Sequence, residues 1–174
     1  MNTVFPFALG SYWASAPAGV LGQTFDSGDG KTWMIVKNSD AAALTAKRVV
    51  KWEDLSAFEV DYATANTQGP MAAGVVDPAL TTTVPVGAAF YVQRTGPTTM
   101  TFGTAATDTA AGSIVVIDDG AAKGEVGGIG ATIALASAGD FAVNNFWHYA
   151  IGVAHAAVVT GPADVEVMLA LRCP

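Results

Sequence analysis

The side chains best suited to acid–base or metal chemistry in this sequence are two histidines, His148 and His155, seven positions apart. On one continuous strand an odd separation puts two side chains on opposite faces of a sheet, which is the wrong geometry for joint metal ligation. His155 would share its face with apolar neighbours, so we interpret it as a hydrogen-bonded core or interface residue. His148 follows Trp147 in an aromatic cluster and is expected to pack and not to react.

Nucleophilic and paired-carboxylate catalysis find no support in the remaining residues. A Gly-x-Ser-x-Gly motif is missing, and the single cysteine, Cys173, lies one residue from the end of the sequence. The acid pairs Glu53-Asp54 and Asp118-Asp119 are adjacent, so on a strand each pair divides between two faces. We predict no catalytic, cofactor-binding or metal-binding residues and expect no enzyme, a hydrolase with an unrecognised site being the weakest alternative.

Two glycine-rich segments resemble ligand loops without completing their motifs. Gly127-Gly128-Ile129-Gly130 lacks the full dinucleotide spacing, and we interpret it as a turn or bulge. Asp26-Ser27-Gly28-Asp29-Gly30 bends sharply and carries two carboxylates, but the other oxygen ligands and closing glutamate of a calcium loop are missing. We expect a hairpin turn there.

Tryptophan side chains are the remaining candidates for ligand contact, because an exposed indole can stack on a sugar. The sequence has four, at Trp13, Trp33, Trp52 and Trp147. Trp33 and Trp52 fall inside strand patterns, where the core or a subunit interface is the commoner position. Sugar binding is therefore an alternative and not our main interpretation.

The elements that would position these residues must come from a chain with little charge. Its 174 residues suit one domain with a substantial core. Hydrophobic residues make up 51% of the sequence and charged residues 13%, about half the share of an average soluble domain. So little charge suggests that partners cover much of the surface.

The sign of the charge and the length of the apolar runs exclude two classes of partner. Eight Lys and Arg residues against fifteen Asp and Glu give a net charge of −7, which repels a phosphate backbone, so we expect no direct nucleic acid ligand. A membrane span needs about 20 consecutive apolar residues. The longest runs, such as Ile114 to Ile117, are far shorter, so we expect no membrane partner.

Alternation of apolar and polar residues predicts strands along most of the chain. The predicted strands are Thr32–Lys37, Lys47–Trp52, Ala57–Ala63, Ala88–Arg94, Thr98–Gly103, Ser113–Asp118, Tyr149–Val159 and Val165–Leu171. The turn-forming separators are Ser27-Gly28-Asp29-Gly30, Gly69-Pro70, Gly96-Pro97, Asp119-Gly120, Gly139-Asp140 and Gly161-Pro162.

This spacing predicts an all-β fold: an antiparallel β-sandwich or β-barrel-like domain with an extended N-terminal arm and at most one short helix. The arm covers residues 1–20 and the single β-rich domain residues 21–174. The one helical stretch is Ser39 to Lys47, which at its length would form one or two turns.

The order of several short segments resembles small structural proteins encoded beside tailed-bacteriophage capsid genes. The first segments are Gly22-Gln23-Thr24-Phe25, Asp29 to Lys37, Ala41-Ala42-Ala43-Leu44 and Lys47-Arg48-Val49-Val50. They are followed by Met71 to Val76, Val86 to Gln93 with Gly96, Ile151-Gly152-Val153-Ala154 and Val165 to Leu171. The resemblance covers about two-thirds of the chain as a pattern of strands and turns.

The resemblance implies a virion structural protein, a capsid decoration or cement protein on the outside of a phage head. Its implied partners are the major capsid protein and copies of itself, as a homotrimer, and its location is the capsid surface of the virion. The family supplies no catalytic residues. An apolar arm such as Val4 to Tyr12 would then lie across a neighbouring subunit. The alternative is a glycan- or receptor-binding β-module of a virion tail or spike.

Overall fold

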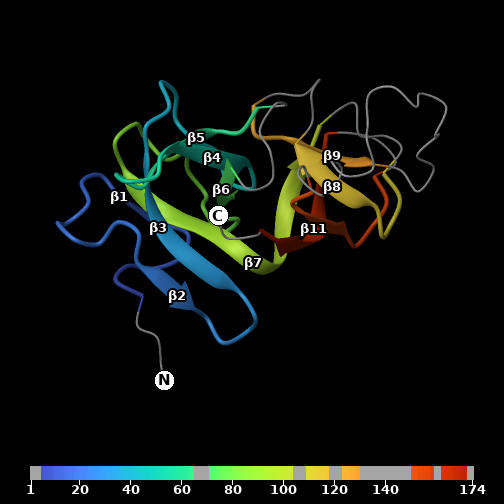
Figure 1. Ribbon diagram of the computed structural model, residues 1–174, viewed down its shortest axis with the longest axis horizontal. Helices are drawn as coiled ribbons and strands as arrows, with labels where there is room; N and C mark the ends of the chain where they lie inside the picture. The colour runs from blue at the N-terminus through green and yellow to red at the C-terminus, as the bar shows by residue number, and fades with distance from the viewer. Residues whose placement is uncertain are drawn as a thin grey trace.

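The fold of the described residues consists of strands and turns, as the sequence predicted (Figure 1). The computed structural model describes residues 5–64, 71–103, 109–117, 123–129, 150–158 and 162–171. In these ranges the strands are β1 (Tyr12–Trp13), β2 (Thr24–Asp26), β3 (Thr32–Asn38), β4 (Val49–Asp54), β5 (Glu59–Tyr62), β6 (Ala72–Val76), β7 (Ala89–Phe102), β8 (Ile114–Ile117), β9 (Val126–Ile129), β10 (Gly152–Ala154) and β11 (Ala163–Ala170).

The strands close into two rings that share β7. The first half of β7 pairs with β6, and the order β6, β4, β5, β3 returns to β7. The second half of β7 pairs with β9, and the order β9, β8, β10, β11 again returns to β7. We call these the first ring and the second ring. Figure 1 shows the first ring on the left, the second on the right and β7 running from one to the other.

The bend of β7 corrects one sequence prediction. Gly96-Pro97 was expected to be a turn between two strands, but both residues lie inside β7. Thr95 is the changeover point, since it faces Thr32 of β3 and also Ala170 of β11. Gly96 has a φ of +85°, and a Cβ there would lie 2.5 Å from the Gly30 carbonyl oxygen. A glycine lets the strand bend and exchange partners without ending.

Each ring encloses its own hydrophobic core. In the first ring the buried side chains include Val36, Val50, Val60, Phe90 and Val92. In the second ring they include Met100, Phe102, Val115, Val167 and Leu169. The alternation predicted for β11 is confirmed, because Val165, Val167, Leu169 and Leu171 are all buried.

Side chains on the outside of the first ring complete the core of the second. Val49 and Val75 face away from the interior of the first ring and belong to the second cluster. Arg48 forms an ion pair with Glu125 at 2.6 Å, and the Thr101 amide donates to the Lys47 carbonyl. The two rings therefore share a buried contact as well as a strand.

Residues 5–20, the predicted arm, lie on the outer face of the first ring. Phe5 and Phe7 contact Tyr91, with ring centroids 5.5 Å and 4.2 Å apart, and β1 pairs with the start of β7. The Gly10 amide also donates to the Asp77 carboxylate at 2.6 Å. The segment thus packs on its own chain, while the domain boundary at residue 20 stays a prediction.

The predicted helix at Ser39–Lys47 is wrong. The Asp40 amide donates to the Asn38 side chain and the Ala42 amide to the Asp40 side chain, so local polar groups take the donors that a helix would use. Leu44 forms a bridge with Val84, and Lys47 has a φ of 66°. The segment is an irregular loop.

The predicted turn or bulge at Gly127–Gly130 is also wrong over its described part. Gly127 and Gly128 lie in β9 and pair with β8, while Gly130 lies outside the described residues. The Thr109 side chain comes within 2.2 Å of where a Cβ on Gly128 would lie, and its hydroxyl accepts the Gly128 N–H. Glycine occurs here because a neighbouring side chain needs the space.

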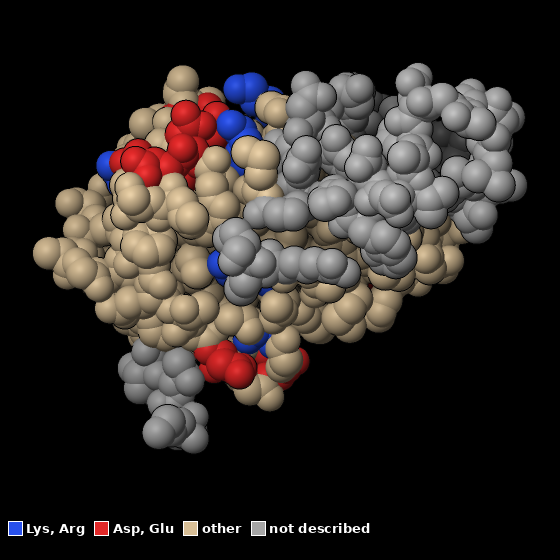
Figure 2. All heavy atoms as spheres, viewed as in Figure 1, with Lys and Arg blue, Asp and Glu red and all other residues tan. Residues whose placement is uncertain are grey.

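On the face shown in Figure 2, charged side chains gather in a few places. On the face in Figure 2, acidic residues lie over the β4–β5 hairpin and at the β2–β3 turn, with broad uncharged areas between them.

The predicted hairpin at Asp26–Gly30 is confirmed by the antiparallel pairing of β2 with β3.

Candidate functional site

The histidine predictions separate in the structure. His148 lies outside the described residues. His155 is exposed, with its Nδ1 3.7 Å from Glu166 Oε2, so the core alternative of the core-or-interface prediction is wrong, and the interface alternative stays a prediction. His155 shares its face with Val153, and this face points outward, because Gly152 and Ala154 are the buried residues of β10. Val153, expected on the same face, is 41% exposed.

The tryptophans do not form a stacking platform among the described residues. Trp33 is 4% exposed and belongs to the aromatic cluster beneath residues 5–20, which confirms its core position. Trp52 is half-buried beside Phe58, with the Arg94 guanidinium 5.9 Å from its ring centroid. Trp13 packs on Phe7. Trp147 and Cys173 lie outside the described residues.

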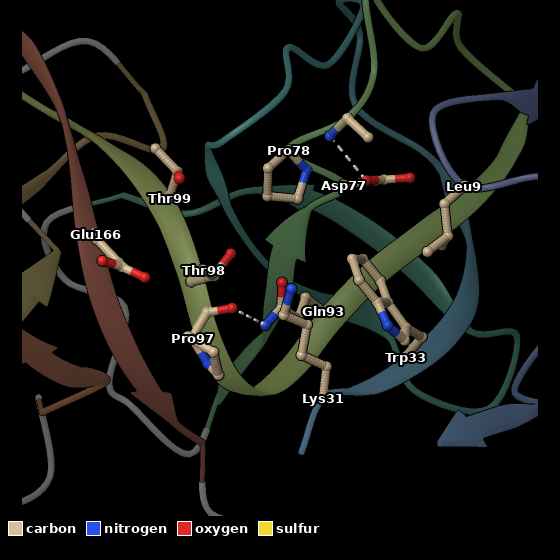
Figure 3. Close-up of a pocket in the computed structure, with 11 residues that line it drawn as sticks. Leu9, Lys31, Trp33, Asp77, Pro78, Gln93, Pro97, Thr98, Thr99 and Glu166 are labelled. Carbon is tan, nitrogen blue, oxygen red and sulfur yellow. Dashed lines mark hydrogen bonds between the residues drawn. The ribbon is translucent and has the colours of Figure 1, made fainter. Parts of the chain in front are cut away.

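A groove of about 300 Å³ lies in the concave side of the β7 bend, between the two rings. Figure 3 shows Gln93 near its middle, Glu166 of β11 on one side and Trp33 with Leu9 on the other. Its remaining lining residues are Lys31, Asp77, Pro78, Ala79, Pro97, Thr98 and Thr99. The groove thus joins the residue 5–20 segment, both rings and the loop after β6.

Polar groups in the groove are held in fixed positions by the backbone. Gln93 is 1% exposed and its Nε2 donates to the carbonyls of Thr95 and Pro97, which fixes the amide. Asp77 is fully buried and accepts the N–H groups of Gly10 and Ala79. This arrangement is a preformed set of oxygen acceptors beside apolar walls.

Two lining residues carry polar atoms without hydrogen-bond partners. These atoms are Trp33 Nε1 and Thr98 Oγ1, and both are buried. Trp33 as a whole is 4% exposed and Thr98 is 5% exposed. Buried polar groups in folded proteins are nearly always paired, so each exception needs a physical reason.

A second polar feature is the carboxyl pair Asp40 and Asp61, which lie close enough for each to shift the pKa of the other. Burial, together with the hydrogen bond and charge of Asp40, raises the pKa of Asp61 above its usual value. Burial also acts to raise the pKa of Asp40, but the hydrogen bonds from Asp61, Ala42 and Tyr62 outweigh it and lower that pKa. One proton shared between two carboxyls explains both directions.

The outer face of the second ring carries a row of apolar side chains across four neighbouring strands. Pro97 faces Met168, Met168 faces Val153, and Val153 faces Ile114. Met168 and Val153 are each 41% exposed. We call these four residues the apolar row. Because strands lie about 4.8 Å apart, the row runs roughly 14 Å across the sheet.

Neither the groove nor the apolar row was predicted from the sequence. Met168 was the available signal for the row, because it is apolar at an outward position of β11 where the neighbouring outward residues, Asp164 and Glu166, are acidic. The groove had no local signal, since Lys31, Asp77, Gln93 and Glu166 are far apart in sequence.

Two further properties concern the described part of the chain only. Among those residues, no cluster of three or more His, Cys, Asp or Glu side chains could hold a metal ion. Over the same ranges, no helix has both the length and the hydropathy to cross a membrane.

Comparison with known proteins gives weak similarity at the level of structure alone. No protein-family model and no curated protein matches the chain. Among solved structures, the N base of head fiber gp8.5 of bacteriophage phi29 is similar over 83% of this chain and 98% of that chain, with 11% sequence identity and a TM-score of 0.48. At that level the fold assignment rests on the strands of this chain, which define an all-β, barrel-like protein.

Proposed function

We propose that this chain is a virion structural protein of a tailed bacteriophage, a decoration or cement protein that binds the outside of the head and stabilises it. Its partners in this proposal are the major capsid protein and further copies of itself, arranged as a homotrimer on the capsid surface. The single observation that carries the proposal is the apolar row on the second ring.

The row has the properties of an interface core. Met168, Val153, Ile114 and Pro97 lie side by side across β11, β10, β8 and β7, so their apolar surface is continuous. The cores of protein interfaces are depleted of charge relative to the rest of the surface. A continuous apolar strip on a rigid sheet gives a partner a preformed surface, which limits the entropy lost on binding.

The composition supports the same role. With 13% charged residues, the chain has fewer ionic groups than an average soluble domain, and neutral surface is tolerated where neighbouring subunits cover it. The segment order that resembles phage structural proteins is a second reason to propose a structural role in the virion.

Co-sedimentation tests the proposal. Shells that lack this protein, from the phage whose genome carries the gene, are mixed with the purified chain and pelleted. We expect saturable binding, and we expect Met168→Glu to weaken it by at least about 10-fold, because a carboxylate in the row would be desolvated without a partner. Val86→Glu is the matched control, since Val86 is 57% exposed and lies outside the row.

Two outcomes would count against the proposal. Wild-type protein that stays in the supernatant would exclude the head as the partner. Equal binding by the Met168→Glu and Val86→Glu variants would place the contact surface elsewhere. Sedimentation equilibrium of the free chain tests the trimer separately.

A further inference from the structure

We infer that the groove in the β7 bend is a binding site for a neutral, hydroxyl-rich ligand, a carbohydrate of one or two rings. The inference rests on the groove alone and not on the capsid-binding role. A volume of about 300 Å³ lies at the lower end of the range for small-molecule sites, which limits the ligand to that size.

The charge of the lining disfavours an anionic ligand. Lys31 contributes one positive charge, and Asp77 and Glu166 contribute two negative charges, so the ionic lining sums to −1. A phosphate, sulfate or sugar acid would meet two carboxylates and one ammonium group. Anions are therefore repelled on balance.

A cationic side chain from a protein partner is also a poor match. The buried carboxylate, Asp77, already accepts two backbone N–H groups, from Gly10 and Ala79. Lys31 lies in the same groove, and its ammonium group, which is 3.3 Å from the Asp29 carboxylate, places a positive charge where a second cation would bind. Glu166 is an exposed rim residue, where an ion pair adds little affinity.

Ligand hydroxyl groups match the uncharged polar groups that line the groove. The Gln93 amide is fixed through its nitrogen by the carbonyls of Thr95 and Pro97, which leaves its oxygen as an acceptor. Thr98 has an unpaired hydroxyl, which can donate or accept. Leu9, Pro78 and Pro97 supply apolar walls for the C–H faces of a sugar ring.

Trp33 does not stack on the ligand, although tryptophan stacking was the sugar-binding alternative that the sequence offered. The indole is 4% exposed, so its face cannot receive a sugar, but it forms one wall of the groove and its N–H has no acceptor. Because this N–H is itself buried, a ligand in the groove would change its surroundings without contacting it. The Trp33 indole resonance is therefore the natural reporter of binding.

Nuclear magnetic resonance titration of the full-length, ¹⁵N-labelled chain tests the inference. The probes are glucose, galactose and N-acetylglucosamine, with glucuronic acid and N-acetyl-lysine amide as the anionic and cationic comparisons. We expect at least one neutral sugar to shift the Trp33 indole signal saturably, with a Kd of about 1 mM, as a small site with few polar contacts allows.

Ala79→Trp and Thr82→Trp are the paired variants. Both positions are exposed in the loop between β6 and β7, but only Ala79 lines the groove. Ala79→Trp fills the groove without removing a polar group, so we expect it to abolish the shift, and we expect Thr82→Trp to retain it. The folded state of each variant is verified in the same spectra.

Three outcomes would overturn the inference. One is the lack of a saturable shift with all three neutral sugars. Another is a shift that survives Ala79→Trp, since it would then come from a different site. The third is a saturable shift with N-acetyl-lysine amide and none with the sugars, which would mark the groove as a receptor for a basic side chain of a protein partner.

Discussion

At the scale of single residues, buried polar groups distinguish this chain from a simple apolar barrel. Asp40 is 4% exposed and Thr98 is 5% exposed. The Asp40 carboxylate accepts hydrogen bonds from the amides of Ala42 and Tyr62, whereas the Thr98 hydroxyl has no partner. Paired and unpaired groups respond to substitution in opposite directions, because only the loss of a paired group leaves its partner unsatisfied.

The Asp40–Asp61 pair makes stability depend on pH. Because the folded pKa of Asp61 is raised, its contribution is complete below the ordinary aspartate value of 3.8 and is lost as the pH rises through the folded pKa. Asp40 has a lowered pKa, so its contribution is lost only as the pH falls from 3.8 through its folded pKa. Between the folded pKa of Asp40 and the folded pKa of Asp61, the shared proton stabilises the fold.

Asp61→Asn should remove the loss of unfolding free energy that occurs at higher pH in the wild type. The asparagine amide donates to Asp40 at every pH, so we expect the variant to exceed the wild type by about 1 kcal/mol in unfolding free energy near neutral pH, and to match it near pH 4. Urea unfolding across a pH series measures this difference. Glu53→Gln, at an exposed position of β4 in the same hairpin, is the control. A pH-independent difference for Asp61→Asn would refute the shared proton.

Thr98 and Thr101 form a matched pair within β7. Thr98→Val replaces an unpaired buried hydroxyl by a methyl group, and we expect the unfolding free energy to rise by about 1 kcal/mol. Thr101 donates to Asp164 at 2.9 Å, so Thr101→Val should lower it by a similar amount. Chemical denaturation distinguishes them. Equal destabilisation by both would mean that the Thr98 hydroxyl is paired after all.

At the scale of elements, β7 determines the architecture because it belongs to both rings. Its two halves were predicted from their alternating residues, and the residues that form them were placed correctly. The continuous connection between the two halves was not predicted, because Gly-Pro is typical of turns. Sequence alone also does not show that β11 replaces β3 as the partner of β7 at Thr95. Local patterns predict strands well, whereas partner exchange depends on contacts distant in sequence.

Gly96→Ala should show how much the bend depends on glycine. The residue has a φ of +85°, and the new Cβ would lie 2.5 Å from the Gly30 carbonyl oxygen. We expect a loss of unfolding free energy of about 3 kcal/mol, from backbone strain and the clash together. Gly87→Ala is the control, because Gly87 also has a positive φ, of +80°, but open space around it.

The control variant should lose only about 1 kcal/mol, the part due to backbone conformation. Denaturation midpoints at constant slope measure both values. Equal losses for Gly96→Ala and Gly87→Ala would show that the β2–β3 hairpin turn does not constrain the bend.

At the scale of the whole molecule, the two rings should unfold together. Val49 and Val75 belong to strands of the first ring but lie in the core of the second, so the second core is incomplete without the first ring. We expect one transition, with Val60→Ala in the first ring and Val167→Ala in the second each shifting it by about 1 to 3 kcal/mol. Circular dichroism and tryptophan emission, followed together, test this. Two separated transitions would show independent rings.

The site could not be predicted at this scale for a physical reason. The fold class followed from alternation, composition and turn residues. The groove, in contrast, is made where the β7 bend brings Lys31, Gln93 and Glu166 together, and the apolar row depends on the register of four strands. Register and bending are properties of long-range pairing, and one sequence read locally does not contain them.

Electron cryomicroscopy of shells saturated with the purified chain tests the proposed role most directly. The account predicts added density on the outside of the head, in the shape of two joined rings. The second ring should lie with Met168 and Val153 against a neighbouring subunit. Shells without added density, or density in which those two residues face solvent, would contradict it.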